Sequence, residues 1–158
     1  MSSRRASSSS PEGFTLLELI VTMAITVLLA SLGYVFSFQY VRLQHLREAA
    51  QIVSAELEQA RAESYGQKDT AGHGVKVFAD HVVRYTGASY AARTTAKDAS
   101  TTFPISGTLS GDDEIEFPEG GYAPDAASTV TLTIDTRAID ISVSAYGLVE
   151  VTERTVGS

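Results

Sequence analysis

Glu18 is the residue of this sequence whose chemistry most needs an explanation. It stands near the start of a hydrophobic run that carries no other charge between Phe14 and Tyr40. A carboxylate at membrane depth is costly, about 2.5–3.5 kcal/mol on insertion scales for the comparable Asp, so a cationic partner is expected. The chemistry that Glu18 offers is therefore the pairing of one negative charge in apolar surroundings.

Carboxylates also gather in the C-terminal half of the chain, where their oxygens could serve as ligands for Ca²⁺. The set lacks the spacing of an EF-hand loop, and two of its members would point out of a strand. Its members are Asp112, Asp113, Glu114, Glu116, Glu119 and Asp125. We predict no metal site from this pattern, and the sequence leaves calcium binding by the segment open.

Catalytic patterns are missing from the sequence. His45, His73 and His81 are too scattered for a zinc site, and we expect Asp80 and His81 to form a turn. There is no G-x-S-x-G nucleophile motif and no glycine-rich phosphate loop between a strand and a helix. Cysteine is absent, which excludes disulfides and thiolate chemistry. The sequence thus predicts neither enzymatic activity nor a cofactor.

The charge balance narrows the class of partner. The 158 residues include 12 Lys and Arg against 19 Asp and Glu, for a formal net charge of -7. An acidic chain without a basic face has little attraction for phosphates. We therefore expect no nucleic acid partner.

The elements that would position Glu18 begin with a polar leader over residues 1–13, which includes Arg4 and Arg5 and cannot bury a core. From Leu19 to Phe38 follow 20 uncharged, mostly apolar residues. As a helix they would span about 30 Å, the thickness of a bilayer core. We predict a transmembrane helix half over residues 14–41, because the run is too long for a cleaved secretory signal.

The helix is predicted to continue as an amphipathic half over residues 42–65. Its apolar positions recur at alternating spacings of three and four, with charged residues between them. The stripe consists of Leu43, Leu46, Ala50, Val53, Leu57, Ala60 and Ser64. Gly66 is the expected stop. A break near Gly33 or Gln39 stays an alternative, since glycine weakens a helix without ending it.

Beyond Gly66 the pattern changes to short strands and predicts a β-rich globular domain over residues 66–158. The strand segments are 75–78, 82–86, 129–135, 139–145 and 148–152, with 101–105 and 114–117 as weaker candidates. The last three strands alternate as an antiparallel meander whose dry face includes Val149 and Val151. The fold class is therefore α+β: a long N-terminal helix packed on an antiparallel β-sheet or on a small two-sheet β domain.

One segment resembles a known family. The residues GFTLLE at 13–18, followed by a long apolar run, are similar to the processing site of type IV prepilins and type II secretion pseudopilins. The resemblance implies a pilin-like fold and a prepilin peptidase that cuts after Gly13. It also implies that the new N-terminal residue, Phe14, is N-methylated and that Glu18 takes part in assembly.

The resemblance supplies a cation for Glu18. Cleavage would create an α-amine on Phe14, and such amines have an unperturbed pKa of about 7.7–8.0 and are largely protonated at neutral pH. Glu18 could pair with the amine of its own chain, or with that of a neighbouring subunit and so set axial register in a filament. The alternative is a carboxylate at the headgroup level of an ordinary membrane anchor.

The same resemblance implies partners and a location. The partners are other pilin or pseudopilin subunits, the prepilin peptidase, an inner-membrane assembly platform and membrane lipid. The location is the cytoplasmic (inner) membrane, crossed once, with the N-terminus inside. The globular domain then lies outside the cytoplasm, in the periplasm or at the cell surface.

A second resemblance concerns the subclass. The runs GVKVF, VVRYTG and AYGLVEV resemble the H-type minor pseudopilins and the T-type minor pilins. The lack of cysteine, and with it of the disulfide-closed loop of many major pilins, also favours a minor subunit. We therefore predict a structural minor subunit of a type II secretion pseudopilus or a type IV pilus. The alternatives are a DNA-binding minor pilin of a competence pilus, which the acidic mature chain disfavours, and an unrelated single-pass membrane-anchored domain.

Overall fold

The computed structural model describes residues 13–157, and within this range the side chains of residues 32–37 are not described. The predicted leader therefore lies outside the described residues except for Gly13. The chain divides into two compact units, Met1–Phe38 and Gln39–Ser158. The long helix α1 contributes residues to both.

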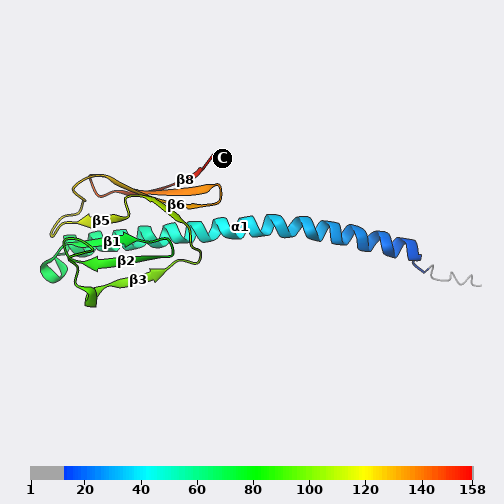
Figure 1. Ribbon diagram of the computed structural model, residues 1–158, viewed down its shortest axis with the longest axis horizontal. Coiled ribbons are helices and arrows are strands. Elements are labelled where there is room, and N and C mark those ends of the chain that lie inside the picture. Colours follow the sequence, from blue (N-terminus) through cyan, green and yellow to red (C-terminus); the bar gives the residue numbers. More distant parts are fainter. Residues whose placement is uncertain (1–12, 158) are drawn as a thin grey trace, which may run out of the picture. The chain divides into compact units, whose positions relative to one another are not determined.

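Helix α1 covers Leu16–Tyr65 and includes Gly33 and Gln39, so the structure lacks the break that the sequence left open (Figure 1). A single glycine costs a helix about 1 kcal/mol relative to alanine, which its neighbours can offset. The helix ends one residue before Gly66, as predicted. The Gly66 N–H donates to the Ala62 carbonyl at 2.9 Å and closes the last turn.

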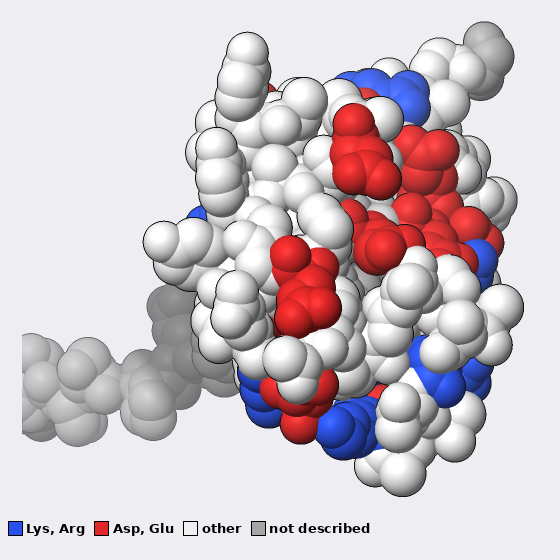
Figure 2. Space-filling model, turned by 90° about the vertical axis from the view of Figure 1, so that its left-hand side faces the viewer, with Lys and Arg blue, Asp and Glu red and all other residues white. Residues whose placement is uncertain are grey.

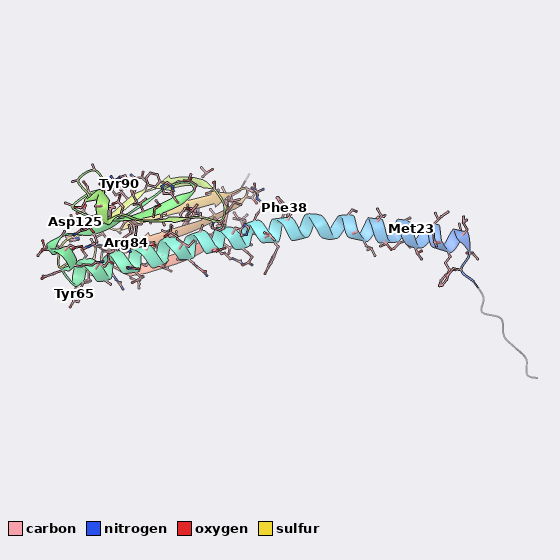
Figure 3. All side chains as sticks on the ribbon, turned by 90° about the horizontal axis from the view of Figure 1, so that it is seen from below. Met23, Phe38, Tyr65, Arg84, Tyr90 and Asp125 are labelled. Atoms are coloured by element: carbon pink, nitrogen blue, oxygen red, sulfur yellow. The ribbon has the colours of Figure 1, made fainter. Side chains whose placement is uncertain are left out.

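In the first unit, α1 turns its apolar side chains outward, as Met23 illustrates in Figure 3. The hydroxyls of Thr22, Thr26 and Ser31 each donate to a backbone carbonyl three or four residues earlier, at 2.7–3.0 Å. These hydroxyls therefore need no partner outside the helix. In the part of the chain that the structure describes, no helix combines the length and the hydropathy needed to cross a membrane.

In the second unit, residues 39–65 of α1 bury one stripe of side chains. The buried residues are Leu46, Ala49, Ala50, Val53, Leu57, Ala60 and Ser64. They confirm the predicted stripe except at Leu43, which is only half-buried. Leu57 is 0% exposed. Burying such a side chain stabilises a protein by about 1.5–3 kcal/mol.

The first sheet has the strand order β3-β2-β1-β5, and all neighbours are antiparallel. Its strands are β1 His73–Val77, β2 His81–Thr86, β3 Ala99–Thr102 and β5 Glu114–Phe117. All four segments predicted here are strands, with boundaries that shift by a few residues at most. Two short 3₁₀ helices flank them, η1 Lys68–Thr70 and η2 Thr95–Lys97.

The second sheet has the order β4-β6-β7-β8, again antiparallel. Its strands are β4 Thr108–Gly111, β6 Ser128–Ile134, β7 Arg137–Val143 and β8 Val149–Thr155. The predicted meander is confirmed, whereas β4 was not predicted. Val151 pairs with the buried Ile141 and so lies on the predicted face, but it is 46% exposed. β8 is the outermost strand of its sheet, and an edge strand gains less cover than a central one.

The core joins both sheets to the helix stripe. Buried side chains of α1, of the first sheet and of the second sheet form one hydrophobic cluster. Figure 1 shows strands of both sheets alongside the C-terminal part of α1. Ser64 Oγ donates to the Phe117 carbonyl at 2.7 Å and accepts from the His73 N–H at 3.3 Å. One hydroxyl thus ties the end of the helix to β5 and β1, and the predicted α+β fold is confirmed.

Candidate functional site

The N-terminus of α1 is built by Thr15, which precedes the first helical residue. Its side-chain Oγ1 accepts a hydrogen bond from the Glu18 N–H at 3.2 Å, and its carbonyl accepts from the Leu19 N–H at 3.2 Å. Thr15 is thus the N-cap, and Glu18 occupies the third helical position. The pattern Thr-x-x-Glu before an apolar run is the sequence signature of a capping box. We did not predict this role for Thr15, although the signal is present in the sequence.

Glu18 lies in the first turn of α1, where the positive end of the helix dipole favours a carboxylate. Among the described residues, no basic side chain forms an ion pair with it. Thr22, Thr26 and Ser31 satisfy their hydroxyls within the helix, whereas the Glu18 carboxylate has no such partner among the described residues. The helix terminus therefore offers one negative charge to a group outside the described chain.

The predicted cleavage bond lies just before this turn. Gly13 and Phe14 precede α1, and the Phe14 side chain is 85% exposed. A Cβ added at Gly13 would meet nothing within 4 Å. An exposed, non-helical peptide bond next to a capped helix is accessible to a peptidase. The structure thus brings Gly13, Phe14 and Glu18 together at one helix end.

Comparison with known families singles out the same segment. Residues 9–34 match the family model of the prokaryotic N-terminal methylation motif, a range that contains Gly13, Phe14 and Glu18. The match supports a type IV prepilin-like protein that is a substrate of prepilin peptidase. It indicates a family of structural subunits rather than enzymes, and it suggests anchoring at the inner membrane. No curated protein and no solved structure matches the chain.

The predicted carboxylate set does not come together as one site. Asp113 pairs with Lys76 at 2.7 Å, and Asp112 accepts from the Thr129 N–H at 3.1 Å. Glu114 accepts from the Tyr85 hydroxyl at 3.0 Å and from the Tyr90 N–H. In the described range, no group of three or more His, Asp or Glu residues is arranged to hold a metal ion.

Glu116 and Asp125 lie near each other at the opposite end of β5. Burial raises the pKa of Glu116, and the charges of Asp125 and Glu114 raise it further. Among the described residues, Glu116 and Asp125 form no ion pair, whereas Glu114 lies 3.6 Å from the Lys76 ammonium nitrogen.

The three histidines lie in different environments. His45 is on α1, and His81 begins β2 with its Nδ1 2.6 Å from the Asp80 carboxylate, next to the predicted turn. His73 is fully buried in β1, and neither of its ring nitrogens has a hydrogen-bond partner among the described residues. Its Nε2 lies 3.9 Å from a Glu63 carboxylate oxygen. Burial lowers the pKa of His73, and the charge of Glu63 opposes this shift.

One polar network in the second unit was not predicted. Arg84 of β2 donates through Nε to Glu56 at 2.9 Å and through a terminal nitrogen to Glu63, both on α1 (Figure 3). Burial would raise the pKa of Glu63, but hydrogen bonds from Lys68 and Gln59 and the charge of Arg84 outweigh it and lower the pKa. The network fixes the helix against the first sheet. Because its members lie far apart in the sequence, no local motif could reveal it.

Proposed function

We propose that the protein is a structural minor subunit of a type II secretion pseudopilus or a type IV pilus, assembled through α1. One observation carries the proposal: within the described residues, Glu18 forms no ion pair in the capped first turn of a helix, shortly after an exposed Gly13–Phe14 bond. The match to the N-terminal methylation motif supports it. The H-type minor pseudopilins and T-type minor pilins are the proposed subclass.

The proposed arrangement follows the predicted segments. Residues 1–13 form a leader that prepilin peptidase removes, and residues 14–41 anchor the chain once in the inner membrane with the N-terminus inside. Residues 42–65 pack on the β domain of residues 66–158, which lies outside the cytoplasm. The 20 uncharged residues from Leu19 to Phe38 support the anchoring role.

Glu18 is proposed to pair with a Phe14 amine, of its own chain or of a neighbouring subunit. Glu18 stands at the Glu position of the capping-box pattern, and in the structure its N–H donates to Thr15 Oγ1. The effects of the charge and of the cap can be separated by substitution. Glu18→Gln keeps a residue that suits the capping box and removes the charge, whereas Thr15→Ala removes the cap and keeps the charge.

The decisive experiment compares Glu18→Ala, Glu18→Gln and Thr15→Ala in cells that assemble the filament. Leader removal is followed by gel, and incorporation is measured by crosslinking and co-purification with the other subunits. We expect all three variants to be cut normally. Glu18→Ala should lose incorporation, because an unpaired amine then enters the bundle at a cost of about 3–5 kcal/mol if the pair is buried. Glu18→Gln should fall between Glu18→Ala and the parent.

Thr15→Ala is the control for the helix cap. The loss of an N-cap costs about 1 kcal/mol of helix stability, so this variant should assemble almost normally. Normal incorporation of Glu18→Ala would show that the carboxylate has no assembly role. A block at cleavage would place its role at the peptidase instead.

Processing has its own test. Mass spectrometry of protein from cells with prepilin peptidase should show a mature N-terminus at Phe14 that carries a methyl group. The exposed bond and the polar leader next to an apolar helix are the physical basis. Recovery of the intact residue 1 from such cells would contradict the proposed family.

A further inference from the structure

We propose that one end of the second unit docks a basic, apolar segment of a partner protein. The surface consists of Tyr122, Tyr146 and Leu148 together with the neighbouring carboxylates Glu119 and Asp125, and we name it the tyrosine surface. It is formed by the loop between β5 and β6 and by the turn between β7 and β8. The inference does not depend on the role proposed for Glu18.

The apolar members of the tyrosine surface are largely exposed. Tyr146 is 83%, Leu148 65% and Tyr122 58% accessible to solvent. The two loops touch each other, since a Cβ added to Gly147 would lie 2.0 Å from the Tyr122 carbonyl oxygen. The backbone of Tyr122 therefore lies next to the turn that carries Tyr146 and Leu148. Clustered exposed apolar residues mark interaction sites, and tyrosine is among the residues enriched at their energetic centres.

The turn that presents these side chains is fixed before any partner binds. Ser144 Oγ accepts from the Tyr146 N–H at 3.3 Å and from the Leu148 N–H at 3.1 Å. Arg61 of α1 donates to the Gly147 carbonyl, which anchors the turn to the helix. Gly147 has a φ of 77°, a conformation that glycine adopts without strain. A preformed turn loses little conformational entropy on binding, which favours recognition.

The carboxylates of the tyrosine surface favour a partner segment with basic side chains. Among the described residues, no basic side chain forms an ion pair with Glu116, Glu119 or Asp125, and burial and then the charges of Asp125 and Glu114 raise the pKa of Glu116. Figure 2 looks onto this end of the unit and shows acidic side chains gathered there. A second copy that used the same surface would place carboxylates against carboxylates. A segment with Arg or Lys instead neutralises them, and its cations also suit the faces of tyrosine rings.

The test uses the full chain in a non-ionic detergent and three short fluorescent peptides. One peptide combines Arg and Leu, the second replaces Arg by Glu, and the third replaces Leu by Ser. Fluorescence anisotropy should show binding of the Arg/Leu peptide that weakens with added salt. The Glu/Leu peptide should not bind, and the Arg/Ser peptide should bind about tenfold more weakly. Equal binding of the Arg/Leu and Glu/Leu peptides would overturn the proposal.

Variants locate the binding on the tyrosine surface. Tyr146→Ser and Leu148→Ser should each weaken the Arg/Leu peptide about tenfold. Asp125→Asn should weaken it and flatten the salt dependence, whereas Glu48→Gln, which removes one exposed charge from α1, should change neither. Circular dichroism confirms that each variant is folded.

Three outcomes would contradict the inference. The first is a parent-like affinity in Tyr146→Ser and Leu148→Ser. The second is an equal effect of Asp125→Asn and Glu48→Gln, which would mean that net charge alone attracts the peptide. The third is a sedimentation mass that doubles in the parent but not in Tyr146→Ser, which would make the surface a contact between copies.

Discussion

The two units of this protein differ in how far the apolar side chains of α1 are exposed to solvent. In the first unit, Leu16, Leu17 and Val27 of α1 are 70–78% exposed. In the second unit, Leu46 and Leu57 of the same helix are at most 1% exposed. One helix thus carries a half whose apolar surface is left open and a half whose apolar surface is covered by two sheets.

The two units differ in how much stabilisation they gain by burying their own apolar area. Apolar area contributes to stability only when it leaves water, by about 25 cal/mol per Å². The second unit obtains this contribution from its own sheets. In the first unit, residues 14–31 are all exposed and bury no such area, which agrees with the proposed role of this unit in anchoring and assembly. The segment that matches the family model of the N-terminal methylation motif lies in this first unit.

The largest predicted effect is the unfolding of the second unit by a charge placed in its core. A fragment that starts near Arg42 should be soluble and folded, because the helix stripe and the sheets cover each other. In it, Leu57→Asp would bury an unpaired charge and should cost more than about 4 kcal/mol, enough to unfold a marginally stable domain. Circular dichroism and thermal melting measure the loss.

Gln51→Asp is the matched control for this substitution, since it places the same residue at an exposed position of α1. It should change the free energy of unfolding by about 0.5 kcal/mol or less. If Leu57→Asp proves as stable as its parent, the stripe does not form the core, and the contrast between the two halves of α1 fails.

A smaller effect should come from Gly74→Ala in the first sheet. The new Cβ would lie 2.3 Å from the Tyr85 phenol oxygen and 2.9 Å from the Ile115 carbonyl oxygen. Tyr85 would have to move from its hydrogen bond with Glu114, and such overpacking costs about 1–3 kcal/mol. Urea unfolding gives the change. Gly157→Ala is the control, because its Cβ meets nothing within 4 Å, and an equal loss in both variants would refute the steric cause.

The smallest effect is a pH dependence that belongs to the second unit. Burial lowers the pKa of His73 from its usual 6.5, while Glu63 opposes the shift and Lys68 and Asp69 add smaller effects. The unfolded chain therefore takes up a proton at a higher pH than the folded chain. Stability should be fully present above about pH 6.5 and should fall below it, by at most about 1.4 kcal/mol per pH unit.

Urea unfolding between about pH 7.5 and 5.5 measures this slope above the range in which ordinary carboxylates titrate. His73→Gln should flatten the dependence. His45→Gln, at a half-buried position of α1, should keep the slope of the parent. A slope that survives in His73→Gln would assign the titration to another group.

The fold was largely predictable because its signals are periodic and local. The helix stripe from Leu46 to Ser64 and the alternation of β6 and β7 follow from spacings of 3.6 and 2 residues. β4 gave no such signal, since it has four residues and ends in Gly111, a weak strand former. Val151 lies on the predicted face but is exposed, because alternation identifies a face, while the position of a strand in its sheet decides how well that face is covered.

The candidate site was predictable in part. Gly13, Phe14 and Glu18 belong to one short segment, so their proximity follows from the sequence alone. The same segment also contains the capping-box pattern of Thr15 and Glu18, but we did not predict the N-cap from it. The contacts of Arg84 with Glu56 and Glu63 were beyond sequence reasoning, because they depend on how β2 is placed against α1.

The exposed edge of β8 carries a consequence for solubility rather than for folding. The Val156 N–H donates to the Thr136 carbonyl, and this phase of the ladder turns the backbone groups of Val149, Val151, Glu153 and Thr155 away from β7. Seven residues of open edge are a template on which other strands can grow into aggregates. The charged side chains within β8 act as gatekeepers against such growth, because stacking them in register would bring like charges together. Acid that neutralises the carboxylates removes part of this protection, so colloidal stability and folding stability are controlled by different residues of the same domain.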